Sequence, residues 1–200
     1  MKKMSRTEIL TGLMAVLFVC GCQKNDVDKS STGVANEVAK EFLPPQELKD
    51  FRQVNLVGDN NDFSPAHIDA NLINAWGVTF PSSGPAWVSS QGGSVAEIFN
   101  GDGSAARPPV AIPSHTAATG GHPTGVVVNN TGDFVLPNGN PARFIFAEAE
   151  GVISAWNGGN AAIKVAEDIN NPFYFGIALA SDRGNNFLYI ANFSEGKIEV

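Results

Sequence analysis

A three-strand phrase recurs three times along the chain, and this recurrence limits the possible folds more than any other feature. Each copy consists of a glycine-containing strand, a turn, a second strand, a glycine turn and a third strand. The first strands carry the anchor glycines Gly77, Gly125 and Gly176, which lie 48 and 51 residues apart. A period of about 40 to 50 residues with three or four strands per unit is typical of a β-propeller blade.

The segments between the turns have the composition of strands. They are rich in Val, Ile, Phe and Trp and are bounded by clusters of Gly, Asn, Pro and Ser, and no stretch shows a helical stripe. We therefore predict an all-β fold, a β-propeller, of which this chain holds about three blades. A β-sandwich also consists of short strands, but it does not predict the same phrase at a near-constant period.

Glycines and aromatic residues have distinct roles in this prediction. The anchor glycines would let the backbones of neighbouring inner strands crowd around a central axis. The turns at Gly92–Gly93, Gly151 and Gly196 would take the positive φ that glycine adopts without strain. Aromatic side chains would fill the gaps between blades, namely Trp87, Phe99, Phe144, Phe146, Trp156, Phe187 and Tyr189.

The number of units is small for a closed ring. Propellers close with about four to eight blades, and the third unit reaches the end of the sequence at Val200. We expect the chain to be the front part of a longer protein or a truncated product. The alternating run 51–57 predicts a strand that would join the last blade of a closed ring.

The N-terminal sequence has the pattern of a signal for export. Basic residues precede a mostly apolar run over 9–20, which is shorter than the roughly 20 residues of a membrane-spanning helix. Gly21 and Cys22 then resemble a bacterial lipoprotein cleavage site, with 1–21 as the signal peptide and Cys22 as the lipidated first residue. A plain secretory signal and an uncleaved anchor are the alternatives.

Charge and cysteine usage exclude several classes of protein. The formal charge of −7 argues against nucleic acid as a partner. Both cysteines, Cys20 and Cys22, precede the body, so it has no disulfide framework and no cysteine metal site. We expect a polar tether over 22–41 and a propeller domain over 42–200. The lipid would anchor the protein to a membrane of the bacterial envelope, for which we expect the outer membrane, and the protein would face the periplasm or the cell surface.

A family resemblance rests on several short motifs. The run 54–57, the segment 67–77 that ends in Ala75-Trp76-Gly77, and the segments 121–125, 144–147, 150–157 and 188–193 together resemble an uncharacterised bacterial family of exported NHL-like propeller proteins. The resemblance covers residues 51–200. It implies a propeller of six blades and supplies no activity.

The loops before the first strand of each unit would face the central channel of a propeller. Asp69, Asn74 and Asn171 carry oxygen ligands suited to Ca²⁺. NHL-like propellers include lactonases and related hydrolases that hold a metal in this channel, so the resemblance makes these residues candidate ligands. Further channel residues are His67, Asn71 and His122. The alternative is that Asp and Asn here bond to their own backbone and cap turns.

Two functions from different classes stay open. The first is a non-enzymatic propeller that binds a small molecule or a protein partner, because the sequence has no nucleophile elbow and no zinc-binding histidine spacing. The second is a metal-dependent, lactonase-like hydrolase that uses the channel.

Glu148 and Glu150 flank a tight hairpin. Paired carboxylates can do acid–base chemistry, although we expect both to be solvated at a hairpin tip.

Overall fold

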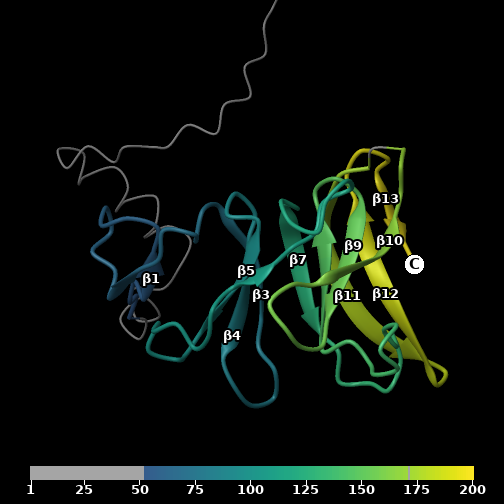
Figure 1. Ribbon diagram of the computed structural model, residues 1–200, viewed down its shortest axis with the longest axis horizontal. Coiled ribbons are helices and arrows are strands. Elements are labelled where there is room, and N and C mark those ends of the chain that lie inside the picture. The colour runs from purple at the N-terminus through teal and green to yellow at the C-terminus, as the bar shows by residue number, and fades with distance from the viewer. Residues whose placement is uncertain (1–51, 171) are drawn as a thin grey trace, which may run out of the picture. The chain divides into compact units, whose positions relative to one another are not determined.

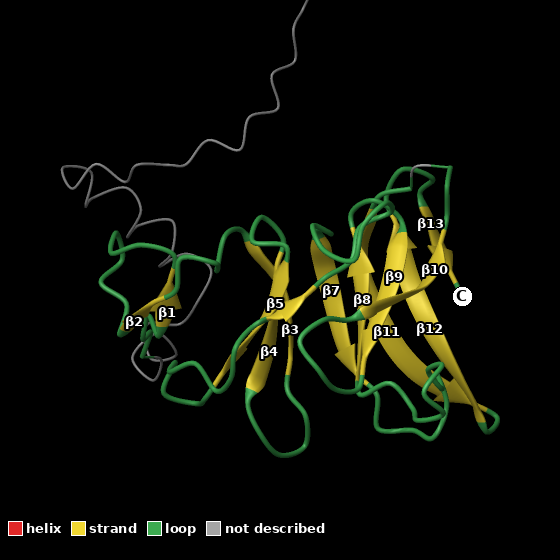
Figure 2. Cartoon of the chain, viewed as in Figure 1, coloured by secondary structure: helices red, strands yellow, loops and turns green. Residues whose placement is uncertain are grey.

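All the secondary structure described in this protein is β-strand (Figure 2). The computed structural model describes residues 52–170 and 172–200, of which Gln53–Val200 form one unit. In these ranges no helix is long and apolar enough to cross a membrane. The predicted all-β class is confirmed. The proposed signal 1–21, Cys22, the tether 22–41 and Asn171 lie outside the described residues.

The first unit of the repeat forms a four-stranded antiparallel sheet (Figure 1). The strands lie in sequence order, from β3 (Ala75–Thr79) through β4 (Ala86–Ser90) and β5 (Val95–Phe99) to β6 (Val110–Ala111). The spatial order equals the chain order because each strand is joined to the next by a turn or short loop.

A short parallel pair of strands precedes this sheet. It consists of β1 (Val57–Gly58) and β2 (His67–Ile68). The strand predicted over 51–57 is therefore wrong in its bounds, since of the described residues 52–57 only Val57 is in a strand. The backbone oxygens of Asn55 and Leu56 instead accept hydrogen bonds from Ala66 and His67.

The second and third units form two further antiparallel sheets. The second contains β7 (Pro123–Val128), β8 (Phe144–Glu148), β9 (Val152–Trp156) and β10 (Ile163–Glu167). The third contains β11 (Tyr174–Asp182), β12 (Asn185–Asn192) and β13 (Lys197–Glu199). Each sheet therefore begins with the strand that carries an anchor glycine.

The first strands of the three sheets, β3, β7 and β11, lie side by side and are called the inner strands below. A Cβ atom at Gly77 would lie 2.9 Å from Gly125 Cα and from Val126 N. A Cβ atom at Gly125 would lie 2.9 Å from Ile177 Cγ2 and 3.0 Å from Ile177 N. Real Cβ atoms do not approach other atoms so closely, so these two glycines permit the packing. The predicted crowding is confirmed at Gly77 and Gly125, whereas Gly176 makes no such contact.

The turn glycines follow the prediction in two of three sheets. Gly151 and Gly196 have φ values of 75° and 62°. The prediction is wrong for Gly92–Gly93, because Ser94 takes the positive φ of 59° in that turn. Gly93 is needed for a different reason. The carbonyl oxygen of Asn71 occupies the space that its Cβ would fill.

Aromatic residues fill the space between the first two sheets, as predicted. Trp87 stacks on Phe144 with ring centroids 3.8 Å apart and contacts Trp156 at 4.8 Å. Burial of such large rings supplies much of the hydrophobic stabilisation of a sheet pair. Phe187 and Tyr189 differ from the prediction, because they are only half-buried on β12.

Candidate functional site

The residue before each inner strand has an equivalent position in all three sheets. Its carbonyl oxygen accepts a hydrogen bond from the backbone N–H that follows the second strand of the sheet. The three donor–acceptor pairs are Gln91 to Asn74 at 3.2 Å, Ala149 to His122 at 2.9 Å and Phe193 to Phe173 at 2.8 Å. The inner strands run in the same direction (Figure 2) and lie side by side, so these lead-in positions share one end of the strands.

Exposed aromatic rings gather at this end. Trp76 of β3 and Phe175 of β11 each precede an anchor glycine, and their ring centroids lie 5.2 Å apart. Phe175 also stacks on Phe193 at 4.9 Å and lies 6.1 Å from Phe173. These four residues, the aromatic cluster, are 38% to 69% exposed. Contiguous exposed apolar patches are common at the binding surfaces of proteins.

The second sheet leaves room for the contact between Trp76 of the first sheet and Phe175 of the third sheet. Thr124 of β7 holds the position that corresponds to Trp76 and Phe175, and it is 3% exposed. Its hydroxyl donates to the carbonyl oxygen of Ala147 at 3.2 Å. Because Thr124 is small and turned into the protein, rings from the first and third sheets can meet across β7.

Polar side chains occupy the lead-in positions of the first two sheets. The Asn74 amide donates to Gln91 Oε1 at 3.0 Å, and Asn74 has a φ of 52°, which asparagine tolerates better than most residues. His122 Nδ1 lies 3.0 Å from Glu150 Oε1, and both side chains are about 40% exposed, at 39% and 43%. A ligand can therefore compete for the hydrogen bonds of both pairs.

Each sheet also buries one polar side chain at the end of its second strand. These residues are Ser90, Glu148 and Asn192, which pair with the first residues of the inner strands. Ser90 and Asn192 form hydrogen bonds with neighbouring backbone or side-chain groups. At Glu148, no group in the described part of the chain makes a hydrogen bond of ordinary geometry to either carboxyl oxygen.

Burial keeps Glu148 protonated at neutral pH. Its side chain is 1% exposed and lies against Gly121. Desolvation is the main cause that raises its pKa, to about 8; the Glu150 charge adds to the rise, and the Ser154 hydroxyl and Lys164 oppose it. The expectation of a solvated carboxylate is therefore wrong for Glu148, because the side chain points into the protein. It holds for Glu150, which is partly exposed.

A second buried carboxyl, Glu97 of β5, faces Asp69. Glu97 is 1% exposed, and burial, followed by the nearby Asp69 charge, raises its pKa to about 7. Asp69 Oδ1 accepts a hydrogen bond from Asn71 N at 3.0 Å. Asp69 therefore caps its own turn, as the alternative interpretation of the sequence expects.

The predicted calcium ligands have different surroundings. Asp69 lies with Glu97, whereas Asn74 binds Gln91, and Asn171 lies outside the described residues. His67 is in β2 beside the turn at Gly103, and Asn71 contributes its carbonyl oxygen to Ser90. Of the described residues, no three His, Cys, Asp or Glu side chains are grouped to hold a metal ion. Of the predicted channel residues, Asn74 and His122 occupy equivalent positions at the inner-strand ends.

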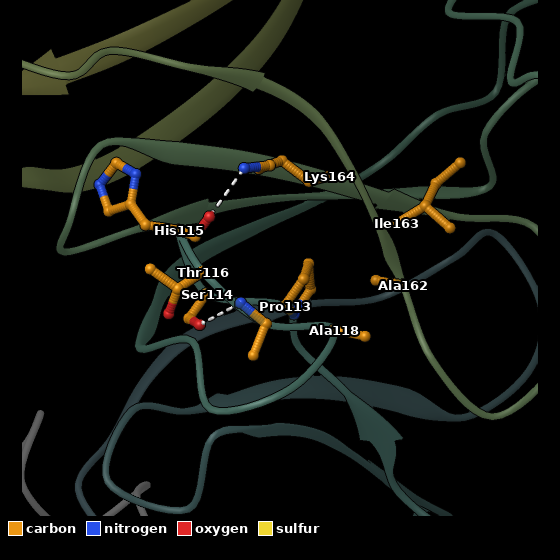
Figure 3. Close-up of a pocket in the computed structure, with 9 residues that line it drawn as sticks. Pro113, Ser114, His115, Thr116, Ala118, Ala162, Ile163 and Lys164 are labelled. Carbon is orange, nitrogen blue, oxygen red and sulfur yellow. Dashed lines mark hydrogen bonds between the residues drawn. The ribbon is translucent and has the colours of Figure 1, made fainter.

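A hollow of about 350 Å³ lies between the loop 113–118 and β10 (Figure 3). Lys164 Nζ donates to the carbonyl oxygen of His115 at 2.9 Å and to Glu167 Oε2 at 2.6 Å. Glu167 also lies 3.1 Å from His115 Nδ1, and these contacts, that of Lys164 first, lower the Glu167 pKa. The charged groups satisfy one another, so they fasten the loop to β10.

These observations define an all-β protein of packed antiparallel sheets with an aromatic and polar surface at the ends of its inner strands. The chain is 26% identical over 159 residues to an uncharacterized protein of Acanthamoeba polyphaga mimivirus. The alignment covers 74% of this chain and 38% of the length of that protein. No protein-family model and no solved structure matches the chain.

None of the four residues of the aromatic cluster was among the predicted site residues, although the sequence contains a signal for them. Aligning the three units on their anchor glycines brings Trp76, Thr124 and Phe175 to one position. Two aromatic residues directly before an inner-strand glycine indicate rings at the same level of neighbouring sheets. Phe173 and Phe193 follow from the backbone pairing of β11 and β12, which composition does not show.

Proposed function

We propose that the chain forms part of a six-bladed, NHL-like β-propeller, held at the bacterial envelope by a lipid on Cys22, that binds a ligand at the ends of its inner strands. The glycine-mediated contacts of β3, β7 and β11 support the propeller, because inner strands must crowd around its axis. The contact between Trp76 and Phe175 carries the binding proposal, since it joins exposed rings from two different sheets.

The class of ligand follows from the chemistry of the surface. The exposed rings of the aromatic cluster offer flat apolar faces, while the Asn74–Gln91 and His122–Glu150 pairs offer hydrogen-bond donors and acceptors. A saccharide has a matching structure, because its ring has an apolar C–H face and a rim of hydroxyl groups. We therefore propose a neutral saccharide as the ligand.

Tryptophan fluorescence tests this proposal. Trp76 is 42% exposed, whereas Trp87 and Trp156 are each 4% exposed, so a ligand at the site should change the emission of Trp76 selectively. Titration with chito- and cello-oligosaccharides should give a saturable change in fluorescence. The Trp76→Ala variant should bind the oligosaccharide about tenfold more weakly, as measured by calorimetry.

The control for this experiment is Phe63→Ala. Phe63 is 71% exposed and lies outside the aromatic cluster, so its removal should leave the affinity unchanged. The binding site is misplaced if Trp76→Ala and Phe63→Ala weaken binding equally. The saccharide class is wrong if neither series of oligosaccharides binds.

The lipid anchor has its own test. Each buried methylene of an acyl chain stabilises membrane attachment by about 0.8 kcal/mol, so Cys22→Ser should move the protein from the membrane fraction to the soluble fraction. The matched variant Cys20→Ser should stay in the membrane fraction, and the opposite result would assign the lipid to Cys20.

A further inference from the structure

Two arginine side chains lie over one tryptophan ring of the second sheet. The guanidinium carbon of Arg107 is 4.8 Å from the centroid of the Trp156 ring, and that of Arg143 is 5.9 Å from it. Both distances are within the range of about 6 Å over which a cation is attracted to a ring face. A guanidinium over a ring still carries N–H donors around its own plane. These three residues are called the arginine site below.

The arginine site lies at the other end of the second sheet from the lead-in positions. At the lead-in end, Pro123 of β7 pairs with Glu148 of β8. At the other end, Val128 pairs with Phe144, and Phe144 pairs with Trp156. The arginine site is therefore separate from the surface proposed to bind a saccharide, and the two proposals can fail separately.

The arginine site joins a loop of the first sheet to the second sheet. Arg107 is in the loop between β5 and β6. Arg143 directly precedes β8, where its backbone N–H donates to the carbonyl oxygen of Trp156 at 2.8 Å. The carbonyl oxygen of Arg143 accepts a hydrogen bond from Asn129 N at 2.9 Å. Because its backbone is held on both sides, the side chain of Arg143 begins next to Trp156.

The carbonyl oxygen of Gly159 orients Arg107 over the ring. It accepts hydrogen bonds from Arg107 Nη2 at 2.8 Å and from Trp156 Nε1 at 3.1 Å. Arg107 Nε also donates to the carbonyl oxygen of Pro108 at 3.3 Å. Within residues 52–170 and 172–200, no group accepts a hydrogen bond from Arg107 Nη1 or from the guanidinium of Arg143. Both side chains therefore keep donors for a ligand.

The charges of the two arginines also lack partners in the described ranges. Lys164, Arg183 and Lys197 are each in an ion pair with an Asp or Glu side chain. Neither Arg107 nor Arg143 has such a pair there, although the chain has 20 Asp and Glu against 13 Lys and Arg. Two unpaired cations beside one ring repel each other, and an anion bound between them would offset this repulsion.

We propose that the arginine site binds a phosphate group. At neutral pH a phosphate carries a charge of about −1.5 to −2, which matches two guanidinium charges. Its oxygens point in several directions, so Arg107 and Arg143 can each donate to a different pair of them. The exposed Arg143 side chain can turn toward an anion that Arg107 already holds. A carboxylate fits less well, because it has a single charge and two oxygens in one plane.

The Trp156 indole reports on binding directly. Its Nε1–H shares the Gly159 carbonyl oxygen with Arg107, so an anion on Arg107 should shift the NMR signal of this N–H. We expect a saturable shift when the full chain, carrying Cys22→Ser to remove the lipid, is titrated with potassium phosphate at constant ionic strength. The Trp76 indole signal should stay in place, and potassium acetate should give no saturable shift of Trp156.

Substitutions of the arginines test which side chains hold the phosphate. Arg107→Ala and Arg143→Ala should each raise the dissociation constant about tenfold. Arg107→Lys should raise it less than Arg107→Ala, because the charge remains. Since Arg143 is exposed, Arg143→Ala should leave the near-ultraviolet circular dichroism spectrum unchanged and so separates binding from folding. Arg183→Ala, whose side chain is 90% exposed and lies beside Asp182, is the control and should bind like the parent.

Glucose 6-phosphate, titrated in the same way, distinguishes the two sources of a phosphate group. Tighter binding than that of inorganic phosphate would assign a phosphate ester as the ligand, and equal or weaker binding would assign the free ion. The proposal is wrong if phosphate gives no saturable shift of the Trp156 signal or if acetate gives the same shift. It is also wrong if Arg183→Ala weakens binding as much as Arg143→Ala does.

Discussion

Replacing Gly77 with alanine should lower the free energy of unfolding by about 2 kcal/mol, because the new methyl group has no space. The Cβ would lie 2.9 Å from Gly125 Cα and Val126 N, which are backbone atoms and cannot rotate away. For a folded unit of this size the melting temperature should fall by roughly 5 °C. Thermal unfolding followed by circular dichroism measures this change.

The matched control for this prediction is Gly132→Ala. A Cβ at Gly132 would meet no atom within 4 Å, and its φ is not positive, so the melting temperature should stay nearly constant. Gly125→Ala should resemble Gly77→Ala, because its Cβ would lie 3.0 Å from Ile177 N. Equal melting temperatures for the three variants would show that the inner strands are not in contact.

Stability should decrease as the pH rises from about 5 to 8. Glu148 has a pKa of about 8 in the folded protein and an ordinary value of 4.5, so the folded state holds a proton that the unfolded state releases. The free energy of unfolding then falls by about 1.4 kcal/mol per pH unit over this interval. Glu97 adds a similar slope up to its folded pKa of about 7.

Glu148→Gln should remove the part of this slope that Glu148 contributes. The amide stays neutral, so at pH 8 the variant should be more stable than the parent by roughly 4 kcal/mol. Asp182→Asn is the control, because the Asp182 side chain is 68% exposed and its charge is not among the causes that shift the Glu148 pKa. Urea unfolding at pH 5, 6, 7 and 8 measures the slopes. A Glu148→Gln variant with the parent's pH dependence would show that Glu148 is already ionised in the folded state.

The repeat predicted the parts of the fold that depend on local sequence. Gly77 and Gly125 are recognisable because glycine weakens a strand, so its return at a fixed period within apolar strands indicates a close approach of backbones. The turn at Gly92–Gly93 was mispredicted because two causes select for glycine there. A positive φ and a close approach of another backbone both require glycine, so the sequence does not distinguish them. The structure shows that Gly93 is required by a close approach.

The site was harder to predict because its residues are equivalent in position and not in chemistry. One backbone hydrogen bond pattern is shared by Asn74, His122 and Phe173. A search for oxygen ligands nevertheless selects Asn74 and does not select Phe173. Glu148 has the sequence context of a solvated hairpin carboxylate, and its burial follows from packing against Gly121. The equivalence of the site positions and the burial of Glu148 both depend on contacts between segments far apart in the chain.

The inner strands of the three sheets meet, so that rings from the first and third sheets form one surface. An NMR measurement of the nuclear Overhauser effect between the Trp76 indole and the Phe175 ring tests it directly, because their centroids lie 5.2 Å apart. We expect a cross-peak between these rings in the full chain. A spectrum that shows the Phe175–Phe193 contact, at 4.9 Å, but not the Trp76–Phe175 contact would show that the first and third sheets do not meet in this way.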